Sequence, residues 1–264
     1  MSSGYGMFKM VLSRLYSDYL RKSKLGDYEK IIKYFIKNNY ESFSIKEFIK
    51  VVRRNQLGEN KILILRHDID TDIGTAKLFF RIEKKYNLKS TYYFRQSTIE
   101  IPFMQEIEDY GSEASYHYEE IAQFCKDHSI KEPAQVIKLL PNIKNLFSNN
   151  FRSLENNLGY KLETLAAHGD FVNRKLKINN NLLLDDKNLR KDIELLIEAY
   201  DEELVSNIDI YMTDINNSPR SIIDAINKYK AIYLCIHPRH WYANWIVNTY
   251  DNINRLYEGI KYSV

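Results

Sequence analysis

The sequence contains few cysteines, which excludes two kinds of small scaffold. Only Cys125 and Cys235 occur among the 264 residues, and their spacing matches neither a CxxC redox motif nor a zinc finger. Two thiols do not make a disulfide-stapled fold. We therefore expect a protein of a reducing compartment and place it in the cytoplasm.

Other absences exclude further classes of function. No stretch approaches the ~20 apolar residues of a membrane span, and residues 1–10 lack the pattern of a secretory signal. The glycine-rich loops GxGxxG and GxxxxGK[ST] are missing, which disfavours phosphoryl transfer. A net charge of +3, without a dense basic stretch, argues against nucleic acid as a partner. These absences predict a protein with no transmembrane segment and no nucleic-acid ligand.

From residue 61 onward, short apolar runs alternate with amphipathic stretches. The runs predict strands at residues 61–65, 90–94, 113–116, 164–167, 208–212 and 231–236. The stretches between them predict helices at residues 73–86, 102–110, 132–147, 188–200 and 219–229. Strands alternating with helices of this length indicate a parallel sheet or barrel. We expect a (β/α) barrel of about seven parallel strands over residues 61–264, with an open doubly wound sheet as the alternative.

The first 60 residues differ from this pattern. They predict helices at residues 7–25, 27–39 and 45–53, the last capped by Ser44. The helix over residues 7–25 is amphipathic and basic, which is compatible with a membrane surface, although a packed or solvated helix is the favoured interpretation. We expect residues 1–60 to form a helical N-terminal extension packed on the barrel.

Histidines follow the apolar runs, most of them beside a carboxylate or an arginine. The runs lead into Arg66-His67-Asp68-Ile69-Asp70, His117-Tyr118-Glu119-Glu120, His168-Gly169-Asp170 and His237-Pro238-Arg239-His240-Trp241. In barrels and open α/β sheets, the carboxyl ends of parallel strands meet on one face, where active sites are built. The pattern therefore predicts one site at that face.

The residue types indicate metal-assisted hydrolysis. Asp68 and Asp70 are two apart, so an extended chain projects both to the same side, while Asp72 is expected to cap the next helix. A carboxylate with His117 and a further ligand fits Zn²⁺, Fe²⁺, Mn²⁺ or Co²⁺. His168 is a candidate for that ligand, although a plain turn explains it equally well, and His237 suits a general acid.

These segments resemble the polysaccharide deacetylase superfamily, the NodB-homology or carbohydrate esterase family 4 group, in the branch found with surface-glycan biosynthesis. The ordered matches are Arg66-His67-Asp68-Ile69-Asp70, Ser90-Thr91-Tyr92-Tyr93-Phe94-Arg95, Glu113-Ala114-Ser115-Tyr116-His117-Tyr118-Glu119, His168-Gly169 and His237-Pro238. The resemblance implies a distorted (β/α) barrel that removes acetyl groups from N-acetylated sugars. It also implies Asp68 as general base, Asp70 and His117 as metal ligands, and His237 as general acid.

The chain departs from that family at three points. It has no counterpart of the usual Arg-x-Pro-Pro type motif, Asp214 at a strand end lacks the arginine and tryptophan that usually follow, and one metal position differs. The family's usual second metal histidine lies four residues after the first, where this chain has Ile121. A third ligand must therefore come from His168, which we favour, or from Glu119 or Glu120. We expect one divalent metal, with zinc favoured and iron, cobalt or manganese as alternatives. The alternative function is a catalytically silent relative that binds glycan or partner enzymes.

Arginines near the strand ends bear on the substrate. Arg66, Arg95 and Arg239 follow apolar runs, and guanidinium forks fit phosphate and carboxylate groups. We expect Arg95, Arg239 and Glu119 to contact an N-acetylated sugar or sugar-linked precursor that carries negative charge. Pairing of these arginines with Asp68, Asp170 or Glu119 is the equally weighted alternative.

Overall fold

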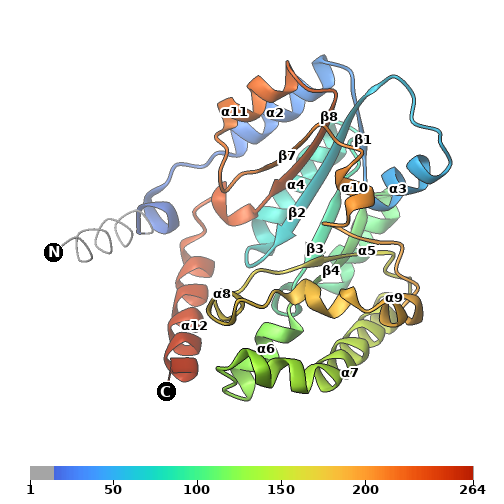
Figure 1. Ribbon diagram of the computed structural model, residues 1–264. Coiled ribbons are helices and arrows are strands. Elements are labelled where there is room, and N and C mark those ends of the chain that lie inside the picture. The colour runs from blue at the N-terminus through green and yellow to red at the C-terminus, as the bar shows by residue number, and fades with distance from the viewer. Residues whose placement is uncertain (1–14, 264) are drawn as a thin grey trace.

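A curled parallel sheet forms the centre of the protein (Figure 1). The computed structural model describes residues 15–263, and within that range every strand pairing is parallel. The strands are β1 (Tyr40–Phe43), β2 (Lys61–Ile69), β3 (Thr91–Phe94), β4 (Glu113–Tyr118), β5 (Thr164–Ala167), β6 (Ile197–Glu198), β7 (Ile210–Thr213) and β8 (Ala231–Ile236).

The strand order is that of a barrel opened at one seam. The sheet runs β6-β5-β4-β3-β2-β8-β7, so β2 to β6 are successive neighbours and β8 returns to pair with β2. A closed barrel of these strands would differ only in a pairing between β6 and β7. β1 extends the sheet along the first half of β2, and β3 pairs with the second half. The predicted distorted (β/α) barrel is confirmed.

Side chains bridge the open seam in place of backbone hydrogen bonds. The Tyr233 hydroxyl donates to the Ala199 carbonyl over 3.2 Å, and the rings of Tyr200 and Tyr211 lie 6.5 Å apart. The inner face of the sheet packs a buried apolar cluster that includes Ile64 and Tyr93. The sheet is therefore curled around a filled interior, as in other small barrels.

Helices surround this sheet. They are η1 (Tyr16–Leu20), α2 (Leu25–Lys37), α3 (Ile45–Arg53), α4 (Ile73–Lys85), η2 (Gln96–Thr98), α5 (Ile101–Tyr110), α6 (Glu120–Asp127), α7 (Pro133–Leu158), α8 (Phe171–Leu176), η3 (Asn180–Asp185), α9 (Lys187–Asp192), α10 (Glu202–Val205), α11 (Pro219–Ile226), η4 (Pro238–His240) and α12 (Trp245–Ser263). None of the helices within the described range is long and apolar enough to cross a membrane.

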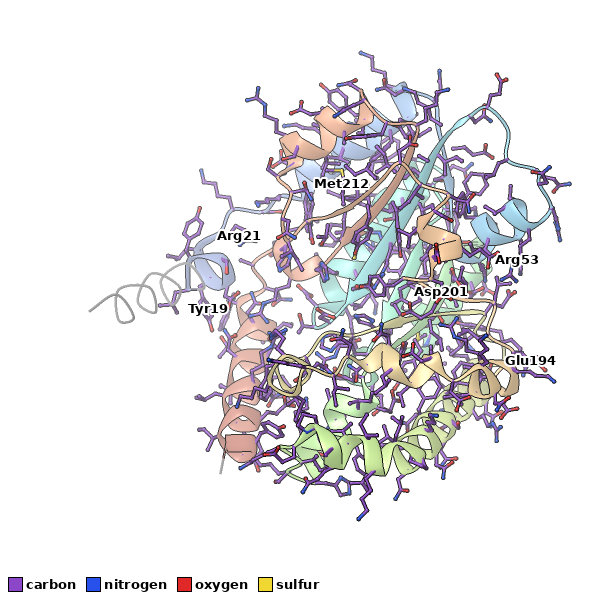
Figure 2. The ribbon with its side chains drawn as sticks, in the orientation of Figure 1. Tyr19, Arg21, Arg53, Glu194, Asp201 and Met212 are labelled. Atoms are coloured by element: carbon purple, nitrogen blue, oxygen red, sulfur yellow. The ribbon has the colours of Figure 1, made fainter. Side chains whose placement is uncertain are left out.

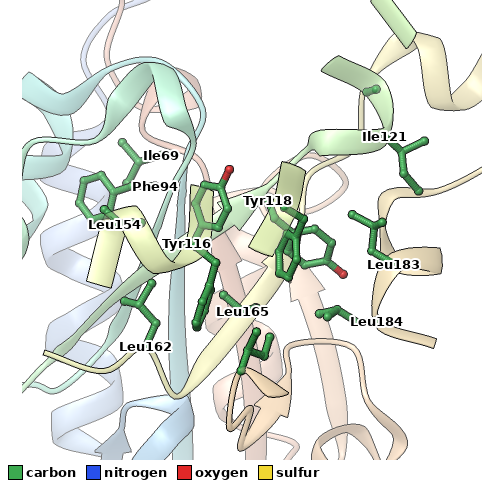
Figure 3. Close-up of a cluster of buried hydrophobic side chains, with 14 of the residues drawn as sticks. Ile69, Phe94, Tyr116, Tyr118, Ile121, Leu154, Leu162, Leu165, Leu183 and Leu184 are labelled. Carbon is green, nitrogen blue, oxygen red and sulfur yellow. The ribbon is translucent and has the colours of Figure 1, made fainter. Parts of the chain in front are cut away.

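The largest apolar core lies between the sheet and helices α4 to α7. Figure 3 shows part of it, with Phe94 and Tyr116 from the sheet close to Leu154 of α7. Leu183 and Leu184 of η3 close the opposite side of the same cluster. This packing fixes β3, β4 and β5 relative to one another, and their carboxyl ends carry much of the site described below.

The structure corrects several predicted elements. The helix predicted over residues 188–200 is wrong beyond α9, because Glu194 takes a left-handed φ of 53° and β6 follows. The Glu198 carboxylate then accepts hydrogen bonds from the backbone of Ala167 (2.9 Å) and Tyr200 (2.7 Å), which holds this segment against β5. α7 is also longer than predicted, and the α6, α8 and α12 helices were not anticipated.

The N-terminal sixty residues contain a strand as well as helices. β1 joins the sheet between α2 and α3, which the apolar pattern did not predict. Residues 7–14 of the helix expected over residues 7–25 lie outside the described residues, and Tyr16–Leu20 is a π-helix. The predicted cap at Ser44 is confirmed, because its side chain accepts from the Glu47 amide.

A core substitution on α7 tests this packing. Phe147→Ala removes a fully buried ring and should lower the free energy of unfolding by about 3–5 kcal/mol. Ile137→Ala, on the same helix but 54% exposed, should cost less than about 0.5 kcal/mol. Denaturant titration of the two variants measures both values, and equal losses would contradict the core assignment.

Candidate active site

Alternation along β2 separates two sets of polar side chains. The strand continues to Ile69, so Arg66 and Asp68 project to the inner face of the sheet, while Ile69 packs in the apolar core. His67 points to the opposite face, where its Nε2 lies 2.6 Å from the Glu83 carboxylate of α4. His67 is therefore remote from the site despite its place in the motif.

Asp70, His117 and His168 converge at the carboxyl ends of β2, β4 and β5. The Asp70 Oδ1 atom lies 3.5 Å from His117 Nε2 and 3.5 Å from His168 Nε2. One ligand atom from each residue falls within 4.8 Å of the others. The structure thus brings together the three residues that the sequence analysis proposed as metal ligands.

The backbone of β5 fixes the orientation of the His117 ring. Its Nδ1 lies 2.9 Å from the Ala166 carbonyl oxygen, so Nδ1 carries the hydrogen and Nε2 presents its lone pair to Asp70. Burial lowers the pKa of His117 to about 4, and the charges of Asp68 and Asp70 offset this only in part. A neutral imidazole held in this way is the form that binds metals.

Carboxylates flank the His168 ring on both sides. Its Nδ1 lies 3.3 Å from Glu119 Oε2, and Nε2 faces Asp70. Glu119 is itself held by Arg95, whose Nη2 and Nε lie 2.6 Å and 3.0 Å from the carboxylate. This chain of contacts orients His168, and Arg95 together with His168 keeps the pKa of Glu119 low despite its burial.

The donor set fits a divalent cation. Asp70 Oδ1 is buried and has no hydrogen-bond partner among the described residues, which is costly for a carboxylate oxygen unless a cation faces it. Two imidazoles and one carboxylate with an open side are typical ligands of Zn²⁺ or Fe²⁺. Asp70, His117 and His168 are therefore the residues that would hold such an ion.

Arg66 fixes the Asp68 carboxylate beside this group. The two side chains form a fork, with Nε to Oδ1 at 2.7 Å and Nη2 to Oδ2 at 2.8 Å. Asp68 Oδ2 also lies 3.6 Å from His117 Nε2 and 3.8 Å from His237 Nε2. Burial opposes the charge, but Arg66, His117 and His237 hold the pKa of Asp68 below its usual range.

His237 lies across the pocket and is paired with Asp214, which follows β7. The His237 Nδ1 atom lies 2.7 Å from Asp214 Oδ1, and Trp241 Nε1 donates to Asp214 Oδ2 over 2.7 Å. Burial alone would lower the pKa of His237, but the hydrogen bond and charge of Asp214 outweigh it and raise the pKa to about 9. His237 is therefore an imidazolium at neutral pH, with Nε2 facing the pocket.

Asp214 was not among the predicted site residues. The available signal was its position two residues after the strand predicted at residues 208–212, close to the signal that selected the histidines. His240 and Trp241 both contact Asp214. Glu120, an alternative third ligand, turns into the core, where it accepts a hydrogen bond from Tyr116.

Two adjoining pockets open around the candidate metal group. One has a volume of about 510 Å³ and contacts Asp68, His117 and His237. The other, of about 790 Å³, contacts Arg95 and Glu119. Both contact Asp70 and His168, so the metal group lies at their junction. These volumes are in the range of small-ligand sites.

The guanidinium groups of the predicted substrate-binding arginines already have acidic partners. Arg95 contacts Glu119, and Arg239 contacts Asp18 at 2.8 Å and also Asp251. Arg239 thereby ties the end of β8 to η1 and α12. Arg174, which the sequence analysis did not select, lines both pockets and forms no ion pair with any described residue.

Comparisons with known proteins give weak likenesses. No protein-family model and no curated protein sequence matches this chain. The Streptococcus pyogenes deacetylase PplD in complex with acetate is 16% identical, with a TM-score of 0.40, over 57% of this chain and 67% of that chain. A mutant of BA3943, a CE4 family pseudoenzyme with restored enzymatic activity, is 12% identical, with a TM-score of 0.41, over 76% of this chain and 69% of that chain.

A third structure, the peptidoglycan deacetylase PdaC from Bacillus subtilis, is 14% identical, with a TM-score of 0.32, over 75% of this chain and 96% of that chain. TM-scores and identities this low carry no argument about what the chain does.

Metal content tests the ligand set. After reconstitution with zinc, iron, manganese or cobalt and removal of free ion, the parent should retain about one metal per chain. Asp70→Ala, His117→Ala and His168→Ala should each reduce this ratio, because a site of three protein ligands loses much of its affinity with one ligand. His128→Ala, on the exposed surface, is the control, and an unchanged ratio in all three variants would overturn the assignment.

Proposed function

We propose that the protein is a metal-dependent hydrolase that removes an N-acetyl group from an amino sugar or glycan precursor in surface-polysaccharide biosynthesis. The observation that carries this proposal is the placement of Asp68 and His237 around the Asp70–His117–His168 group. An ionised carboxylate and a protonated imidazole there face the same pocket. The ordered sequence motifs that resemble polysaccharide deacetylases support the same reaction class.

The roles of the side chains follow from their charge states. A divalent metal, when bound, polarises a carbonyl oxygen and increases the acidity of water. Asp68 is ionised and beside that position, so it takes the proton that an attacking water loses. His237 is protonated and gives its Nε2 proton to the nitrogen that leaves the carbonyl carbon. Asp214 keeps His237 charged and oriented.

A second candidate function has one observation in its favour. The bidentate contact with Arg66 stabilises ionised Asp68, and a carboxylate with a lowered pKa is a weaker base. This favours a catalytically silent protein that binds a glycan or a partner enzyme at the same pocket. Release of acetate distinguishes the two functions.

We also propose that the reaction takes place in the cytoplasm. Both cysteines, Cys125 and Cys235, are buried free thiols, which suits a reducing compartment. Fractionation of cells that express the tagged chain would check this location.

An acetate-release assay on N-acetylated sugars and their nucleotide- and lipid-linked forms tests the proposed activity. Asp68→Asn and His237→Ala should each lower kcat by roughly 10²–10⁴-fold, because each removes a proton-transfer group, while metal content stays near that of the parent. In the pH profile of kcat/KM, the decrease on the alkaline side should lie near pH 9, where His237 loses its proton.

Asp214→Asn sharpens this test. It removes the charge that raises the pKa of His237 above the ordinary value of 6.5, so the protonated acid is lost at lower pH and the decrease on the alkaline side should move toward neutrality. Metal-loaded protein that releases no acetate from any of these substrates would favour the silent alternative. Full activity in both Asp68→Asn and His237→Ala would contradict the assigned roles.

We further propose that the substrate is anionic, with Arg174 as a contact for its negative group. Arg174 lies on α8 directly after the His168 loop and contacts both pockets. Its charge is not neutralised by any described carboxylate, unlike those of Arg66, Arg95 and Arg239. A phosphate or carboxylate on the substrate would supply the missing partner.

Arg174→Gln tests the charge preference. KM for a UDP-N-acetylhexosamine or another phosphorylated N-acetyl sugar should rise about tenfold, the typical effect of losing one hydrogen bond to a charged group. KM for a neutral N-acetylglucosamine oligomer should not change. Arg152→Gln, on the exposed surface of α7, is the matched control. A lower KM for the neutral oligomer than for the phosphorylated sugar, in both the parent and Arg174→Gln, would rule out the proposal.

A further inference from the structure

α12 is amphipathic, but its apolar face points away from the protein. Six large apolar side chains on this helix are between 60% and 71% exposed, namely Trp245, Ile246, Tyr250, Ile253, Leu256 and Tyr257. At 100° per residue they fall within an arc of about 140° that contains no charged residue. A contiguous apolar surface of this kind marks an interaction site.

The polar face of α12 holds the helix against the protein. Asn248 is fully buried and donates to the Asp18 carbonyl over 2.8 Å. Asn252 donates to the Asp18 carboxylate over 3.0 Å, and Asp251 pairs with Arg239. These contacts fix the rotation of α12 about its axis, so the outward position of the apolar face is set by the fold.

η1 extends the apolar surface. Figure 2 shows Tyr19 of η1, and Arg21 just after it, beside one end of α12. The Tyr19 hydroxyl contacts Thr249 and Asn252 of α12, each at 3.3 Å. Leu15, Tyr16 and Leu20 of the same segment are 48%, 57% and 72% exposed. Exposed apolar side chains therefore occur on two segments that are far apart in sequence and in contact with each other through Tyr19.

Basic residues border this surface, and the nearby acidic groups already have partners. Arg21, Lys22 and Lys24 follow η1 directly. On α12, Asp251 pairs with Arg255 as well as Arg239, and Glu258 pairs with Lys126 at 3.0 Å. With Asp251 and Glu258 already in ion pairs, the basic side chains after η1 give this border a positive charge.

We propose that the α12–η1 surface docks on an anionic lipid membrane. Apolar and aromatic side chains enter the interfacial layer, where Trp and Tyr are favoured, while the basic border attracts acidic headgroups. A second copy of this chain fits less well, because a twofold contact at this border would bring basic side chains together, while Asp251 and Glu258, the described acidic residues of α12, already form ion pairs. Tyr250 also lines a pocket, so docking places the pocket next to the headgroups.

Vesicle co-sedimentation of the full chain tests the proposal. The parent should bind phosphatidylcholine vesicles that contain phosphatidylglycerol, and should bind weakly to phosphatidylcholine alone and at high salt. The double variant Ile253→Gln/Leu256→Gln should lower the bound fraction several-fold. Ile36→Gln/Val205→Gln removes two apolar side chains that are 41% and 40% exposed elsewhere and should bind like the parent.

Light scattering on the same samples separates the competing outcomes. No vesicle binding, with a dimeric parent and a monomeric Ile253→Gln/Leu256→Gln variant, would overturn the proposal in favour of a contact between copies. No binding by a monomeric parent, or equal binding by both double variants, would also overturn it. Vesicle binding is measured without substrate, so its result is independent of the proposed deacetylation.

Discussion

The buried ion pair between Arg66 and Asp68 constrains the site more than any other contact. Arg66 has no exposed surface, and an unpaired charge at that depth would cost several kcal/mol. Its guanidinium is held by the Asp68 carboxylate and by the hydroxyls of Tyr233 and Tyr200, at 3.1 Å and 2.9 Å. Tyr200 and Tyr233 also lie at the open seam of the barrel. The charge of Arg66 therefore links the orientation of Asp68 to the curvature of the sheet.

This pair is better understood as a positioning device than as a source of stability. Replacing a buried ion pair with apolar residues is often neutral for folding, whereas removing one partner is costly. The arrangement repeats around the pocket, because each of the three candidate histidines has an oxygen beside the ring nitrogen that faces away from the centre. Ala166 orients His117, Glu119 orients His168, and Asp214 orients His237. Burial leaves His117 neutral, whereas Asp214 keeps His237 charged although that ring is buried as well.

Much of this site followed from the sequence, because parallel strands that end in polar residues must present them on one face. That rule brought Asp70, His117 and His168 together from three strands, and the alternation along β2 put Asp68 on the same side. The rule does not predict which side chains pair with one another. The alternative that the arginines pair with nearby carboxylates holds for Arg66 with Asp68 and for Arg95 with Glu119. The contact of Arg239 with Asp18 was not predicted, since it joins distant segments.

Short elements and outward-facing apolar residues were the other failures. β6 has two residues, too few for a period to be visible, and its position depends on the Glu198 carboxylate. β1 lies between two helices in the sequence, pairs with the edge of β2 and has no long apolar run. In α12 the apolar residues have helical spacing, but sequence periodicity alone does not distinguish a face that packs inward from one that remains exposed.

The central claim is that Asp70, His117 and His168 hold one divalent metal at the junction of the two pockets. An anomalous-scattering map from a crystal soaked in zinc tests it most directly. We expect one strong peak within bonding distance, roughly 2.0–2.2 Å, of Asp70 Oδ1, His117 Nε2 and His168 Nε2. A peak bonded to Glu119 in place of His168 would change the third ligand. No peak near Asp70 and His117 would contradict the account.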